Sequence, residues 1–130
     1  MNVDSVIRKY FYDQLSVEHP VFDSRQGSMN VDKCYLITSQ TKDKTQDTKC
    51  NYAYQTAIEI EIMSRSGVTG NTQSKLIVEE MENFVENAFD NINLSNFAIS
   101  EKRYNAESFD ADISADNKNR KVILINLKLE

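Results

Sequence analysis

Residues 52–89 read YAYQTAIEIEIMSRSGVTGNTQSKLIVEEMENFVENAF, and this stretch decides the fold. In its first part, three isoleucines from Ile58 to Ile62 alternate with glutamates, the period of two that is typical of a half-buried strand. A turn with two glycines follows. The last part repeats apolar residues three and four positions apart, as one face of an amphipathic helix does. The stretch therefore predicts a strand over 52–64 and a helix over 72–89 that covers the sheet.

The flanking sequence predicts a second helix and further strands. Apolar residues three and four apart predict a helix over 3–15, which ends before Pro20 because proline cannot continue a helix. Alternation and short apolar runs predict further strands at 34–40, 97–104, 109–115 and 122–129, with a polar turn at 116–120. This order predicts an α+β fold with one mostly antiparallel sheet of about four to six strands. The N-terminal helix and the long amphipathic helix are expected on one face of it.

Residues 41–51 are predicted to form an exposed loop or arm, because 41–49 contain no apolar side chain. At ~3.3 Å per residue the strand at 52–64 would be ~43 Å long, so it either bends or extends past the body of the domain. We hypothesise that segment 41–64 makes contacts between copies of the chain, and that deleting 42–49 leaves a folded monomer that no longer assembles. The charged candidates for these contacts are Lys42, Asp43, Lys44, Asp47, Lys49, Glu59 and Glu61.

Length and charge limit the class of protein. A chain of 130 residues predicts one domain with one real core. The net charge of −5 argues against binding nucleic acid through its phosphates. No apolar run approaches the ~18 residues of a membrane span, and the N-terminus lacks the pattern of a secretory signal. We therefore expect a protein of the cytoplasm that does not bind membranes.

No motif in the sequence carries recognisable chemistry. Asp110 and Asp112 begin like a calcium loop, but Ala115 stands where glycine is needed and Lys121 where the bidentate glutamate is needed. A solvated strand face explains the two aspartates equally well. His19, the only histidine, has no nucleophile near it in sequence, and a surface or capping role is favoured. The sequence predicts no metal, no cofactor and no enzymatic activity.

The outer side of the long helix carries a stripe of acids. Like charges four residues apart weaken a helix, and acids in its last turn oppose the helix dipole. Intrinsic helix stability therefore does not explain them, and three interpretations remain open: a solvated face, a docking face for a basic partner, or an acidic wall facing DNA. The candidate lumen or docking acids are Glu79, Glu82, Glu86, Asp90, Asp110 and Asp112.

The succession of predicted elements resembles a known family across nearly the whole chain. The matching pieces are the helix Val3–Leu15, His19–Asp23, the strands Cys34–Ile37 and Thr56–Ser64, the turn at Gly67, the helix Ser74–Phe89, Phe97–Tyr104 and the closing strands to Leu129. In order and size they are similar to the tail terminator and tail-completion proteins of tailed double-stranded DNA bacteriophages. The resemblance does not extend to the Lys42–Lys49 arm or to Asp110 and Asp112.

This resemblance implies a single terminator-like domain over 1–130 and a structural role in the virion. It implies a homo-oligomeric ring, commonly a hexamer, that ends tail assembly at the head–tail junction and leaves a channel for genome DNA. The implied partners are further copies of the chain, the tail tube, and head-completion or connector proteins, while DNA passes without specific binding. Assembly would take place in the host cytoplasm. The alternatives are another neck or connector component, or a small cytoplasmic module whose sheet holds a ligand or peptide.

Overall fold

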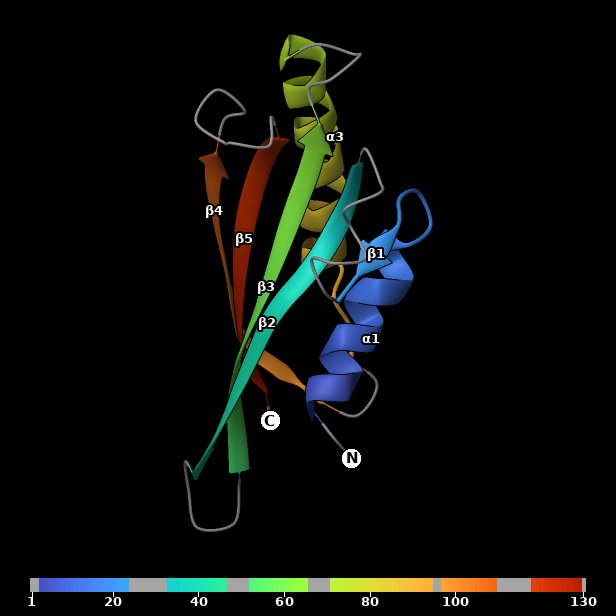
Figure 1. The fold of residues 1–130 in the computed structure, drawn as a ribbon. Coiled ribbons are helices and arrows are strands. Elements are labelled where there is room, and N and C mark those ends of the chain that lie inside the picture. The colour runs from blue at the N-terminus through green and yellow to red at the C-terminus, as the bar shows by residue number, and fades with distance from the viewer. Residues whose placement is uncertain are drawn as a thin grey trace.

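The computed structural model describes residues 3–23, 33–46, 52–65, 71–94, 97–109 and 118–129. Within these residues, two helices and one five-stranded mixed sheet form an α+β fold, which confirms the predicted fold class. Figure 1 shows the elements, which in chain order are α1 (Val3–Leu15), β1 (Val21–Phe22), β2 (Lys33–Gln46), β3 (Tyr52–Arg65), α3 (Asn71–Asp90), β4 (Ile99–Phe109) and β5 (Lys118–Leu129).

The strands lie in the order β1-β2-β3-β5-β4. The short strand β1 runs parallel to β2, and every other neighbouring pair is antiparallel, so the predicted mostly antiparallel sheet is confirmed. Near the C-terminus the prediction was partly wrong. The strand expected at 97–104 continues to Phe109, and β5 begins at Lys118, inside the expected polar turn. Most of the strand predicted at 109–115 lies outside the described residues.

The loop predicted at 41–51 is corrected for its first six residues. Residues 41–46 belong to β2 and pair with β3, because the backbone ladder gives polar residues the same hydrogen bonds as apolar ones. Residues 47–51 lie outside the described part of the chain. Deleting 42–49 would therefore remove paired residues of β2, so it does not test the subunit contacts cleanly.

A β-bulge divides the β2–β3 hairpin. The register shifts between Ile37 and Ser39, which makes Thr38 an extra residue on β2. Beyond the bulge, pairing continues until Gln46 lies opposite Tyr52. The far end of this hairpin reaches past the end of β5 and past the start of α1 (Figure 1). Of the two alternatives left open for the long strand, bending or extending past the body, the structure shows the second (Figure 1).

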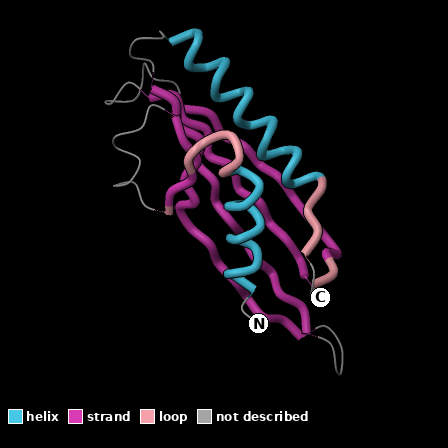
Figure 2. Tube along the Cα trace, turned by 90° about the vertical axis from the view of Figure 1, so that its right-hand side faces the viewer, coloured by secondary structure: helices cyan, strands magenta, loops and turns pink. Residues whose placement is uncertain are grey.

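Both helices cover the same face of the sheet (Figures 1 and 2). The buried side chains between the helices and the sheet form one core, in which each well-buried aliphatic side chain contributes about 1.5–3 kcal/mol. They include Ile7, Phe11, Leu15, Tyr35, Ile37, Ile58, Ile60, Ile62, Val78, Met81, Val85, Ala88, Phe89, Leu94, Ile123, Ile125, Leu127 and Leu129. Leu76, an apolar residue of the predicted helix, is 54% exposed and stays outside the core. It lies five residues before Met81, about 140° around the helix.

Polar contacts fix the helices on the sheet. The Tyr35 hydroxyl of β2 donates to the Met81 carbonyl of α3 at 2.9 Å. The ammonium of Lys102, on β4, donates to the carbonyls of Phe89 and Asp90 at 3.1 and 3.0 Å. A cation at this end of α3 is favourable, because the carbonyl end of a helix is partly negative. Lys102 thus offsets the acids of the last helical turn.

The two outer edges of the sheet are long and largely uncovered among the described residues. On one side, β4 pairs with β5 alone. On the other side, β1 pairs with β2 at Tyr35 and Leu36, and residues 37–46 have no described strand on their outer side. Because β2, β3, β5 and β4 alternate in direction, the two edge strands run in opposite directions.

Candidate functional site

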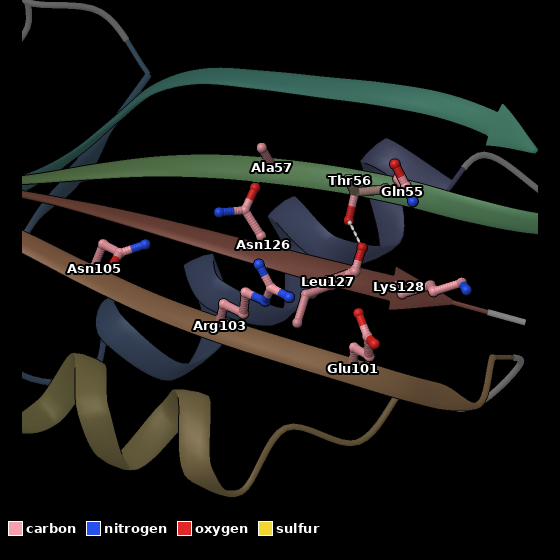
Figure 3. Close-up of a pocket in the computed structure, with 9 residues that line it drawn as sticks. All are labelled: Gln55, Thr56, Ala57, Glu101, Arg103, Asn105, Asn126, Leu127 and Lys128. Carbon is pink, nitrogen blue, oxygen red and sulfur yellow. Dashed lines mark hydrogen bonds between the residues drawn. The ribbon is translucent and has the colours of Figure 1, made fainter.

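The face of the sheet opposite the helices carries a shallow polar depression, which we call the polar trough. Figure 3 shows its side chains on β3, β4 and β5, with the helices behind the sheet. Its volume is about 430 Å³. The residues that line it are Gln55, Thr56, Ala57, Glu101, Arg103, Asn105, Asn126, Leu127 and Lys128.

Strand register brings the side chains of the polar trough together. Asn126 of β5 lies opposite Ala57 of β3 on one side and opposite Arg103 of β4 on the other. Two residues along the same strand, Lys128 lies opposite Glu101. Residues two apart on a strand share a face, so these rows project from the same side of the sheet. The short Ala57 side chain between longer neighbours leaves the hollow.

The chemistry of the polar trough suits hydrogen bonding. Its amide groups offer donors and acceptors, and two cations against one anion give its lining a net charge of +1 (Arg103, Lys128, Glu101). No aromatic ring lines it, so nucleic-acid bases have no platform on which to stack. Its lining has no histidine or cysteine, and the described residues hold no group of three His, Cys, Asp or Glu that could bind a metal. The side chains of the polar trough can therefore form hydrogen bonds with water or with a polar group of another molecule.

At its other end, the sheet face opposite the helices carries buried side chains instead of an open depression. Cys34, Leu36 and Met63 form a second small buried cluster, against which Phe22 packs. Glu61 is also buried here, 2% exposed.

Glu61 does not belong to an exposed contact surface, which corrects its prediction as a contact between subunits. Its Oε1 lies 3.5 Å from a guanidinium nitrogen of Arg120 in the same chain. Glu59, another predicted contact, is half-buried, and its Oε2 accepts a hydrogen bond from the Thr38 hydroxyl at 2.7 Å. The alternation of the strand predicted that both glutamates share a face, but it did not indicate that this face is partly closed.

Three of the other predicted contact residues lie in the described part of β2, toward the end of the hairpin. Asp43 is opposite Gln55 of the polar trough in the strand register. Its neighbours Lys42 and Lys44 are opposite Thr56 and Tyr54. Four predicted residues lie outside the described part of the chain: Asp47, Lys49, Asp110 and Asp112.

Three of the four acids predicted on the outer side of α3 are exposed: Glu79, Glu86 and Asp90. Glu82 faces the sheet instead, which corrects its prediction as a lumen or docking acid. Its Oε1 lies 2.5 Å from the Lys121 ammonium, and its Oε2 accepts a hydrogen bond from the Tyr104 hydroxyl at 3.0 Å. Glu82 is four residues after Val78 and three before Val85, both buried, so it flanks the apolar stripe of the helix.

His19 packs between two aromatic rings. Its ring centroid is 5.8 Å from that of Tyr35 and 6.3 Å from that of Phe84. Burial, and then the positive charge of Lys33, lower the pKa of His19. The histidine therefore serves the packing of α1, β2 and α3.

A second depression, of about 410 Å³, lies between α1 and β1. It includes the half-exposed Tyr12 together with Arg8 and Lys9. These two cations already have partners in the chain, because Lys9 lies 2.8 Å from Asp13 and Arg8 lies 4.0 Å from Asp23. Because both cations form ion pairs within the chain, they offer little attraction to an acidic group of another molecule.

Sequence reasoning did not single out the polar trough. The alternation of apolar and polar residues from Ile125 to Leu129 was a signal that could have placed Asn126 and Lys128 on the face away from the core. Alternation within one strand cannot predict the order of the strands in the sheet. Only that order shows that β5 lies between β3 and β4, where three polar rows meet.

Comparison with known proteins adds no relative. No protein-family model matches the chain, and no curated protein matches it significantly. Neither of the described helices is long and apolar enough to span a membrane.

Proposed function

We propose that this chain is a structural protein of a virus particle, which assembles into a homo-oligomeric ring at the head–tail junction of a tailed bacteriophage. In this role it ends tail assembly and leaves a channel for genome DNA. The observation that supports the proposal best is the pair of long, oppositely directed sheet edges on which no described strand lies. The order of elements, which resembles tail terminator and tail-completion proteins, supplies the biological setting.

Sheet edges of this kind favour association with a further strand. An uncovered edge presents unpaired N–H and C=O groups, which are a template for pairing with another chain. The part of β2 without a described strand on its outer side, residues 37–46, is close in length to β4, Ile99–Phe109. Because the two edges run in opposite directions, joining β4 of one copy to β2 of the next in the same orientation gives an antiparallel pair.

A contact between two different surfaces is head-to-tail, and such contacts close into rings when the rotation between copies permits it. This feature favours a ring over a two-fold dimer. The proposed partners are further copies of the chain, commonly six, together with the tail tube and head-completion or connector proteins. The net charge of −5 supports passage of DNA without specific binding, because DNA phosphates find no large excess of cations.

The experiment that tests the proposal measures the mass and shape of the purified chain. Native mass spectrometry and light scattering are expected to give a closed multiple of the monomer mass of 15.0 kDa, and negative-stain images are expected to show rings. Addition to tail tubes that lack a terminator should place the rings at the tube ends. Rings that bind another part of the neck would favour the alternative of a different connector component.

The polar trough supports a second candidate function, a small module that binds a polar ligand on its sheet. The hollow of about 430 Å³ and its amide lining are the observations that favour it. A chain that stays monomeric at high concentration and binds one polar compound saturably would favour this function over the ring. Loss of that binding in Asn126→Leu, with stability unchanged, would place the ligand in the trough.

A further inference from the structure

We propose that the open face of the sheet, with the polar trough, lines the passage of the ring, and that α1 and α3 form its outer wall. This inference rests on the proposed ring and deepens it, because it assigns an inner and an outer surface to each copy. Three features of the described residues support it: the alternating direction of the strands, the position of the helices and the chemistry of the two faces.

The alternating direction of the strands allows the sheets of neighbouring copies to join into one continuous sheet around the ring. The long strands alternate in direction from β2 through β3 and β5 to β4, so each added copy continues the antiparallel ladder. A continuous sheet that closes on itself has one face inside and one face outside. Every copy must therefore turn the same face toward the passage.

The helices decide which face that is. Both lie on one side of the sheet, where they bury the main core (Figure 2). A helix with its side chains is about 10–12 Å in diameter, so helices on the inside would narrow the passage by roughly 20 Å. They would also bring the exposed acids Glu79, Glu86 and Asp90 of all copies toward one another, and like charges at close range repel.

The open face has the chemistry of a water-filled surface. Gln55, Asn105 and Arg103 are exposed on it, and the exposed large apolar side chain among its described residues is Leu124, at 39%. Amides and charges of both signs can exchange hydrogen bonds with water or with a moving polymer. With a net charge of only +1 per copy, the trough lining makes few lasting phosphate contacts, so it does not hold DNA in place. The trough therefore fits a surface along which DNA slides.

This assignment changes the interpretation of the acids on α3. In the proposed ring, Glu79, Glu86 and Asp90 lie on the outer wall and do not face DNA. Their partners would be neighbouring proteins of the tail or head.

The test compares distances between identical positions in different copies. Single cysteines carry spin labels in a background with Cys34→Ala and Cys50→Ser, and pulsed electron paramagnetic resonance measures the distances in rings of confirmed mass. One pair of variants is Gln55→Cys on the open face and Glu86→Cys on α3, both exposed positions. Asn105→Cys and Asp90→Cys form a second pair, in case one variant of the first pair fails to fold. The background without cysteines, treated with the same spin label, is the control for residual signal.

At any copy number, labels on the inner face of a ring lie closer together than labels on its outer wall. We expect the distances from Gln55→Cys and Asn105→Cys to be shorter than those from Glu86→Cys and Asp90→Cys. The reverse order, or equal distances, would overturn the assignment of the faces. The proposed ring would not be affected by that result, because its mass is measured separately. A chain that remains monomeric in the light-scattering measurement would reject the proposed function, and this inference with it.

Discussion

Glu82 joins α3 to the sheet through charge. The side chains of Glu82 and Lys121 are 13% and 18% exposed, so water screens their attraction only in part. Burial, and then the carboxylate of Glu82, raise the pKa of Tyr104, so its hydroxyl stays protonated and donates to that carboxylate. An acid that composition alone would place in solvent is thus part of the structure of the subunit.

The substitution Glu82→Gln is expected to lower the free energy of unfolding by about 2–3 kcal/mol, because it leaves the Lys121 ammonium largely buried without its anion. The matched control is Glu86→Gln, the same change one turn later on the exposed side of α3. It is expected to alter stability by less than about 0.5 kcal/mol. Urea denaturation measures both variants, and equal effects would show that the ion pair contributes nothing.

His19 makes stability depend on pH. Its pKa is lowered in the folded chain from an ordinary value of 6.5, by burial first and by Lys33 second, while Glu18 and Glu80 act in the opposite direction. The unfolded chain therefore binds the proton more readily, and stability falls as the pH drops through about 6.5. We expect wild type to lose more stability than His19→Gln between about pH 7 and pH 5.

Urea denaturation of the two proteins across that range measures the difference. The carboxylates titrate in both proteins, so their effect cancels in the comparison. Parallel curves would show that the packing of His19 between its two aromatic neighbours is indifferent to its charge.

At the scale of elements, one buried hydroxyl links β2 to α3 in addition to their apolar packing. Burial raises the pKa of Tyr35, so the hydroxyl donates to the Met81 carbonyl. Tyr35→Phe is expected to cost about 1 kcal/mol, because it removes this hydrogen bond from a buried site. Tyr12→Phe, at a half-exposed position of α1, is the control and should be close to neutral. Thermal unfolding of both variants checks the prediction, and a larger loss for Tyr12→Phe would contradict it.

The sequence predicted the helices better than the strands, for a physical reason. A helix closes its hydrogen bonds within itself, so the periodicity of 72–89 was enough to predict Asn71–Asp90 to within one residue at each end. A strand depends on its partners. Residues 41–46 have no apolar pattern and are strand because β3 lies beside them.

The candidate site was less predictable than the fold. Periodicity indicated that Glu59 and Glu61 share a face, yet Arg120, from a distant part of the chain, buries one of them. For Glu82, the position beside the apolar stripe could have been calculated, but its partners Lys121 and Tyr104 come from strands whose order was unknown. Residue identity gives the chemistry of a surface, and strand order decides which residues share it.

At the scale of the whole molecule, assembly is expected to depend on amide groups at the edge of β4. Neighbouring residues of a strand direct their N–H groups to opposite sides, one toward the paired strand and one away from it. Asn105→Pro and Ala106→Pro remove two such neighbouring groups. One of the two variants is therefore expected to stay folded and lose ring formation, while the other loses stability because its hydrogen bond to β5 is gone.

Circular dichroism and native mass spectrometry together measure folding and assembly in the two variants. The pair is its own control, because both carry the same substitution on the same edge strand. Full ring formation by both proteins would show that the edge of β4 is not the subunit contact.

The extra residue in β2 has a consequence for inheritance. Residue 38 adds length to β2 without adding a pair to the ladder. If Thr38 were lost, Ile37 and Ser39 would become neighbours and would still lie opposite Ile60 and Glu59, so every later position would keep its partner and its side. Losing a paired residue of β2 would instead shift the register and turn the later positions over. Homologous genes are therefore expected to lose the codon at this point more readily than the codons on either side of it.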